Sequence, residues 1–165
     1  MSYVAVLSPS NVTSCNDQYP RFTPGACVDT SDGKRYKYVQ NVLNSVATTD
    51  GAICYLDDSD TTGLGYIVTS DYSECLGDTV NAVAGVHRTA GVSDGYWTFV
   101  QIRGTCTVKT NGDDDIAIGM ALIGVGDGTV NSVAAGTAPT NKLVGWAIAA
   151  DSDANDTVLA DLCIA

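Results

Sequence analysis

The sequence predicts an all-β protein: a single compact β-barrel or jelly-roll-like sandwich with an extended N-terminal arm. The chain of 165 residues holds one glutamate, four lysines and seventeen glycines, which is poor material for helices. Short apolar runs rich in valine and threonine, which favour strands, alternate with Gly- and Asp-rich turns at a spacing of about ten residues. Hydrophobic residues make up 45% of the chain, enough to build one core.

We expect residues 1–35 to form the extended arm and residues 36–165 to form the β-barrel or sandwich body. The first segment is rich in Ser, Thr, Asn and Asp, and it contains Pro9, Pro20 and Pro24, three of the four prolines. Its apolar residues are few and scattered, and ordering a residue costs roughly 1 to 2 kcal/mol. We therefore expect the arm to have little structure of its own and to become ordered by contact.

The body begins with four predicted strands, at residues 35–42, 51–56, 66–69 and 80–86. The strand from residue 96 alternates to residue 109, with Tyr96, Val100, Ile102, Cys106 and Val108 on one side and polar side chains on the other, which predicts a half-buried strand. Further strands are expected at residues 116–124, 143–151 and 158–164, with a hairpin turn at residues 126–128.

The series of elements in the last seventy or so residues resembles the capsid decoration, or cement, proteins of tailed bacteriophages. The resemblance is carried, in order, by Trp97 to Gly104, Ile118 to Leu122, Gly126 to Gly128, Val144 to Asp151 and Val158 to Leu162. Residues 36–86 match only in general layout, and residues 1–35 carry no motif of the family.

The resemblance implies a structural virion protein that binds the outer surface of a phage head and stabilises the shell. It implies that the major capsid protein is the partner. It also implies a homo-oligomer, most often a trimer, in which several weak contacts together give tight attachment. Catalysis and a cofactor are not expected. We expect synthesis in the host cytoplasm and a final location on the outside of the capsid.

The net charge of −11 disfavours nucleic acid as a partner, because binding phosphates requires clustered Lys and Arg. Residues 1–37 hold four basic and three acidic side chains, a balance of +1, whereas residues 38–165 hold four basic and sixteen acidic ones, a balance of −12. We therefore expect the contact with the capsid to be led by Arg21, Lys34, Arg35 and Lys37 and by apolar burial. A simpler reading, equally open, is that acidic loops keep a β-protein soluble.

Two features argue against a membrane location. Gly, Asp and Thr interrupt every apolar stretch before it reaches the roughly twenty residues that span a bilayer. The N-terminus lacks the positive region and the apolar run of a signal peptide. We expect no membrane partner and no Sec export.

Motifs of catalysis are incomplete. Gly91 to Gly95 matches G-x-S-x-G around Ser93, but a strand follows it where a nucleophile elbow needs a helix, and the single histidine, His87, lies upstream. This segment is interpreted as a turn, and His87 as a surface or core residue. The acidic runs at residues 57–60, 113–115 and 151–153 lack the EF-hand pattern, which leaves only weak cation binding at a turn open.

Six cysteines occur at wide, irregular spacings without any C-x-x-C pair. A zinc site is poorly supported, because one histidine is available to complete it. Free thiols are favoured over disulfides, with Cys15 and Cys27, which flank a Pro-containing segment, as the pair best placed for a bridge.

Trp97 and Trp146 are interpreted as core or interface anchors. The alternative function is a carbohydrate- or cell-surface-binding β-module of a tail or adhesin, in which these rings would line an open groove. A trimeric hydrolase of the dUTPase kind is a remote third possibility, because no nucleotide-binding motif is present.

Overall fold

The structure is a computed structural model, and it describes residues 7–60, 65–76, 82–112, 115–134, 137–138, 142–151 and 156–164. It confirms the all-β class, with 46% of the described residues in strands or isolated bridges and 6% in helices. The helical elements are α1 (Pro9–Thr13) and the 3-10 turn η1 (Tyr72–Glu74). The strands are β1 (Cys27–Asp29), β2 (Arg35–Asn41), β3 (Ile53–Leu56), β4 (Ile67–Thr69), β5 (Val83–His87), β6 (Trp97–Lys109), β7 (Ala121–Gly126), β8 (Thr129–Ser132), β9 (Leu143–Ala147) and β10 (Thr157–Cys163).

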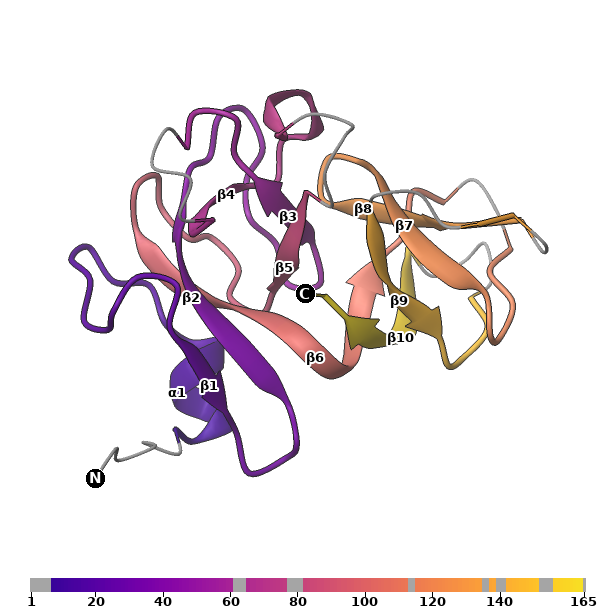
Figure 1. The fold of residues 1–165 in the computed structure, drawn as a ribbon, viewed down its shortest axis with the longest axis horizontal. Helices are drawn as coiled ribbons and strands as arrows, with labels where there is room; N and C mark the ends of the chain where they lie inside the picture. The colour runs from indigo at the N-terminus through magenta and orange to yellow at the C-terminus, as the bar shows by residue number, and fades with distance from the viewer. Residues whose placement is uncertain are drawn as a thin grey trace.

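Five strands close into a barrel, in agreement with the predicted architecture (Figure 1). Strand β2 pairs in parallel with β4, and β4, β3, β5 and β6 follow in antiparallel order. The ring closes because β6 also pairs antiparallel with β2, from Gln40 opposite Trp97 to Arg35 opposite Arg103. A closed ring leaves these five strands no unpaired edge.

Strand β6, which is 13 residues long, also begins a second group of strands. Its first half belongs to the barrel, and its second half pairs with β10, which leads to β9, β7 and β8. An isolated bridge between Thr110 and Val130 brings β8 back beside the end of β6. One apolar core joins both groups of strands, from Ile53 and Tyr55 of β3 to Leu122 of β7 and Val144 of β9.

The hairpin region differs from the prediction in two places. The strand expected at residues 116–124 begins only at Ala121, because Gly119 has φ = +85° in a turn that precedes the strand. Strand β8 was not predicted, since Thr129–Ser132 is too short to show a clear alternation. The turn before it, at residues 126–128, is confirmed as a hairpin connection between β7 and β8.

The extended N-terminal arm is not confirmed. Figure 1 shows α1 and β1 lying against β2 and β6. Strand β1 pairs with β2, and Asp17 forms a two-way backbone bridge with Trp97. Physically, the segment covers an aromatic face of the barrel, and this burial offsets its ordering cost. The proposed boundary between residues 35 and 36 stays a prediction.

The first half of β6 is buried on both faces, whereas the sequence predicted one buried face. The N-terminal segment packs on the face that carries Trp97 and Phe99. Gln101, expected on the solvent side, is fully buried, and its amide donates to the carbonyl groups of Arg103, Gly104 and Thr105. The second half of β6 alternates between exposed and buried residues as predicted.

Candidate functional site

An aromatic cluster fastens the N-terminal segment to the barrel. Its buried members are Val12, Cys15, Tyr36, Tyr38, Trp97 and Phe99. Phe22 inserts its ring edge-on against Tyr38 and Phe99, with ring centroids 5.2 and 5.3 Å apart. Tyr38 stacks on Trp97 at 5.5 Å. Trp97 is therefore a core residue, as interpreted from the sequence, and not part of an open groove.

The carboxylate of Asp17 organises the polar margin of this cluster. It accepts hydrogen bonds from the Tyr38 hydroxyl at 3.1 Å, from Arg21 Nε at 2.7 Å and from the Cys15 thiol at 3.1 Å. Burial raises the pKa of Asp17, but the hydrogen bonds from Arg21, Cys15 and Tyr38 outweigh it and hold the pKa below its usual value. Burial and the neighbouring Asp17 raise the pKa of Cys15 to about 12, which makes this thiol unreactive at neutral pH.

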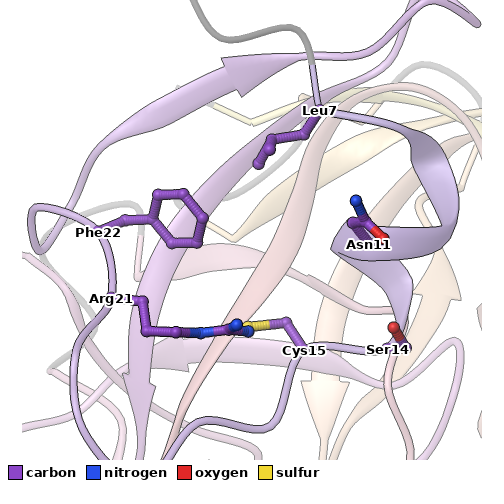
Figure 2. A pocket seen from close by; sticks show the side chains of 6 residues that line it. All are labelled: Leu7, Asn11, Ser14, Cys15, Arg21 and Phe22. Atoms are coloured by element: carbon purple, nitrogen blue, oxygen red, sulfur yellow. The ribbon is translucent and has the colours of Figure 1, made fainter.

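A pocket of about 260 Å³ lies beside this network (Figure 2). Figure 2 shows the Phe22 ring on one side and α1 with Asn11 on the other, with Leu7 at the top between them and the Arg21 side chain extended towards Cys15. Typical small-molecule sites measure about 300 to 1,000 Å³, so this pocket is smaller than most of them. Arg21 is the one predicted contact residue that lines it.

Three of the four predicted contact cations form ion pairs within the chain. Arg21 pairs with Asp17 at 2.7 Å, Lys34 with Asp32 at 3.1 Å and Arg35 with Asp29 at 2.7 Å. Lys37 forms no ion pair with any residue in the described part of the chain.

These cations do not form one cluster around a single point. Arg35 of β2 lies opposite Arg103 of β6, and Lys34 packs close to Gly104, so a basic group gathers at this end of the two strands. Arg21 lies apart, in the pocket. The capsid-contact role of the four residues stays a prediction.

A second candidate surface is the outer face of β9 and β10. Large apolar side chains are exposed there: Trp146 (42%) and Ile148 (41%) on and just after β9, and Leu159 (40%) on β10. The register places Trp146 between Asp161 of β10 and Ala121 of β7. A backbone hydrogen bond from Ile148 to Leu159 sets these two residues side by side. Contiguous exposed apolar residues on a sheet face mark a contact surface.

Gly145 explains how Trp146 reaches this position. A Cβ atom at Gly145 would lie 2.1 Å from the carbonyl oxygen of Asp161. Only glycine allows β9 to approach β10 this closely, and the pairing then turns Trp146 outward beside Asp161.

The one histidine of the sequence is placed in the core and not at a site open to a substrate. His87 is fully buried, and burial lowers its pKa to about 4. Neither ring nitrogen of His87 has a hydrogen-bond partner among the described residues. Asp94 and Gly95 form a turn before β6, which confirms the turn interpretation of the segment around Ser93.

All six cysteines are free, so the suggested bridge between Cys15 and Cys27 is wrong. Cys15 is buried in the aromatic cluster, whereas Cys27 is exposed on β1, so their side chains lie in different environments. Cys54 and Cys106 are buried in the main core as free thiols. Cys163, also placed in a strand, is exposed on β10.

No group of three or more His, Cys, Asp or Glu side chains is placed to hold a metal ion within the described residues. The Asp57 carboxylate accepts from the Asn44 amide at 2.9 Å and from Ser59. Residues 113–114 and 152–153 of the other acidic runs lie outside the described residues. Weak cation binding at those turns stays a prediction.

Comparison with known proteins found no protein-family model that matches the chain and no match among curated proteins. Among the described residues, no helix has the length and apolar content to cross a membrane.

Sequence reasoning missed the apolar face of β9 and β10. The signal was present in β10, where Val158, Ala160, Leu162 and Ile164 alternate as the buried side and leave Leu159 on the other. Its neighbours Trp146 and Ile148 lie on and just after β9, so the patch that the three residues form together cannot be seen from local alternation.

Proposed function

We propose that this chain is a non-catalytic capsid decoration protein that binds the outer surface of a phage head and stabilises the shell. The observation that carries the proposal is the exposed apolar face of β9 and β10, formed by the segment that resembles decoration proteins. A contiguous exposed apolar patch marks a contact surface more often than scattered apolar residues do, and Trp is enriched among the residues that supply most of the energy of a protein contact.

The basic end of β2 and β6 supports a second contact, with the capsid protein. Lys34, Arg35 and Arg103 gather there, in a chain whose net charge is −11. The ion pairs of Lys34 and Arg35 with Asp32 and Asp29 are exposed, so they contribute little to stability, and a partner carboxylate can replace the internal one. Apolar burial is expected to supply most of the affinity and these charges to supply orientation.

The test is the reattachment of the purified protein to heads of the encoding phage from which its gene has been deleted. We expect saturable binding, measured by co-sedimentation, and a higher temperature at which the heads rupture. High salt should weaken the binding only modestly, because exposed charges are screened over about 10 Å at 0.1 M salt whereas apolar burial is not. Heads that bind none of the protein would contradict the proposal.

The alternative of a carbohydrate-binding module rests on one relationship, Asp161 opposite Trp146, because a carboxylate beside an exposed ring can hold a sugar. Ile148 and Leu159 around the ring offer no hydrogen bonds to sugar hydroxyls, which favours a protein contact. Binding to a glycan array that Trp146→Ala abolishes would support the alternative.

A further inference from the structure

We propose that Asn111 is a site of spontaneous covalent modification, at which the side-chain amide is lost as ammonia and a carboxylate replaces it. Asn111 lies just past the end of β6, and it is the one asparagine in the sequence that a glycine follows. Asparagine is among the residues that are chemically labile in proteins. The proposal does not depend on the proposed function.

The reaction is an attack of the main chain on its own side chain. Hydroxide removes the N–H proton of Gly112, and the nitrogen then attacks Cγ of Asn111. The new C–N bond closes a five-membered succinimide ring, while the bond from Cγ to the side-chain nitrogen breaks and ammonia leaves. Water opens the ring at either carbonyl. The product at position 111 is aspartate or isoaspartate, in which the main chain runs through the side-chain carbon.

The backbone at Gly112 leaves the attacking nitrogen accessible. Gly112 is exposed and has φ = +76°, a conformation that residues with a Cβ atom rarely adopt. Among the described residues, the atom nearest to a Cβ built at Gly112 is Asp156 Oδ1, at 3.8 Å. Hydroxide and water can therefore reach the peptide bond between Asn111 and Gly112, and no side chain of residue 112 obstructs ring closure.

The N–H of Gly112 forms no hydrogen bond with any residue that the structure describes. Three of the four glycines that follow an aspartate differ in this respect, because each donates its N–H to a backbone carbonyl: Gly33 to Thr30 at 3.1 Å, Gly51 to His87 at 2.9 Å and Gly95 to Asn41 at 2.8 Å. Such a bond would have to break before the nitrogen could attack a side chain. At Gly112 this cost is absent.

The residues before the reactive bond are held in place. The N–H of Asn111 donates to the Val130 carbonyl of β8 at 3.1 Å, and the N–H of Thr110 donates to the Asp156 carbonyl at 3.0 Å. Thr110 also forms the isolated bridge with Val130. The reaction thus takes place where the chain leaves its last hydrogen bonds to β8.

The product should loosen this contact for two reasons. A new carboxylate appears close to the Asp156 carboxylate, and like charges repel each other. Isoaspartate also adds a carbon to the main chain directly after the N–H that bonds to Val130, which changes the path of the chain that follows. We expect the hydrogen bonds from Asn111 and Thr110 to open more often after the reaction.

The experiment is timed incubation of the whole native protein at pH 9 and pH 6, followed by peptide mass spectrometry. We expect Asn111 to gain aspartate and isoaspartate, faster at pH 9, and the net charge to change from −11 to −12, which anion exchange separates. The internal control is Asn131, since the Cβ of Ser132 hinders attack and the Ser132 N–H donates to Asn131 Oδ1 at 2.6 Å. Asn111 should react at least about tenfold faster than Asn131.

A parallel incubation in urea separates the effect of the fold from that of the sequence. Since the native turn leaves the Gly112 nitrogen unbonded, the native rate at Asn111 should lie within about tenfold of the rate in the unfolded chain. A native rate lower than that, or equal rates at Asn111 and Asn131 in the native protein, would overturn the proposal. Asn111→Gln should abolish the early charge change, because its longer side chain cannot close a five-membered ring.

Hydrogen exchange tests the structural consequence. The N–H groups of Thr110 and Asn111 should exchange at least about tenfold faster in the modified protein than in fresh protein. Asn111→Asp carries the same added charge without the longer main chain, so exchange in this variant measures the part due to repulsion. Unchanged exchange in the modified protein would refute the loosening of β8.

Discussion

The Tyr38 hydroxyl donates a hydrogen bond to the Asp17 carboxylate at 3.1 Å and thereby joins the N-terminal segment to barrel strand β2. The same hydroxyl accepts from the backbone N–H of Arg21 at 3.2 Å. Asp17 and Arg21 of the N-terminal segment thus both form hydrogen bonds with the Tyr38 side chain of the barrel. Burial raises the pKa of Tyr38 to about 12, so the hydroxyl stays a donor throughout the physiological range.

Asp17→Asn should lower the free energy of unfolding by about 1 to 3 kcal/mol, because three donors lose a charged acceptor. The pKa of Asp17 is below its usual value, so this contribution is present above about pH 4 and is lost as the pH falls through the native pKa. Urea unfolding at pH 7 and pH 3 measures it. The difference between wild type and Asp17→Asn should shrink at the lower pH.

The control for this prediction is Asp29→Asn, since the Asp29 ion pair with Arg35 is exposed. We expect no measurable change in stability from it. Equal losses for both variants would show that Asp17 contributes only as a surface charge.

His87→Leu should make the protein more resistant to acid. The pKa of His87 is about 4 in the folded protein, below its ordinary 6.5, because burial disfavours the charged form. The unfolded chain therefore binds a proton more readily, and stability falls as the pH drops from about 6.5 to 4. The full loss is about 3 kcal/mol.

Unfolding free energies of wild type and His87→Leu between pH 7 and pH 4 measure this effect. The two proteins share every carboxylate, so the change in their difference isolates His87. If the difference in unfolding free energy between the two proteins did not vary with pH, burial would not lower the pKa of His87.

Gly145→Ala should destabilise the sheet by more than about 3 kcal/mol or prevent folding, because the new Cβ would meet backbone atoms of Asp161 at 2.1 and 2.9 Å. Gly126→Ala is the matched control within the same group of strands. There the nearest atom is the movable Thr129 Oγ1, at 3.1 Å, and the cost should stay below about 1 kcal/mol. Urea unfolding compares them. A mild Gly145→Ala would mean that β9 and β10 are not paired this closely.

Thiol labelling of the native protein at pH 8 should modify Cys27 and Cys163 first, because both are exposed. Cys15 and Cys106 should react only on unfolding, since burial raises their pKa values to about 12 and about 11. Mass spectrometry of peptides after timed labelling measures the order. Cys15 and Cys27 found bridged, or Cys15 labelled as fast as Cys27, would contradict the structure.

Local patterns predicted most of the strands. Alternation over residues 35–42 and 158–164 requires no knowledge of the partner strand, because side chains of a strand point to opposite faces whatever lies beside it. The turn at residues 126–128 was equally local. Alternation cannot show whether the second face of a strand is also covered, and this is why Gln101 was placed in solvent.

The candidate site was predicted only in part. The four basic residues were visible as a charge imbalance, but the ion pairs that three of them form with Asp17, Asp29 and Asp32 depend on how the N-terminal segment folds back. Arg103 joins Arg35 because β6 pairs with β2 across more than sixty residues of sequence.

Composition and neighbours along the chain predict the all-β class, the approximate strands and the acidic character of residues 38–165. Which surfaces remain exposed follows from contacts between segments that are distant in the sequence. The N-terminal segment covers Tyr38 and Trp97, and no described segment buries Trp146 and Leu159 in the same way. The physical reason is that burial is a property of contacts between distant segments: two tryptophans on similar strands differ in exposure because one faces a folded-back neighbour.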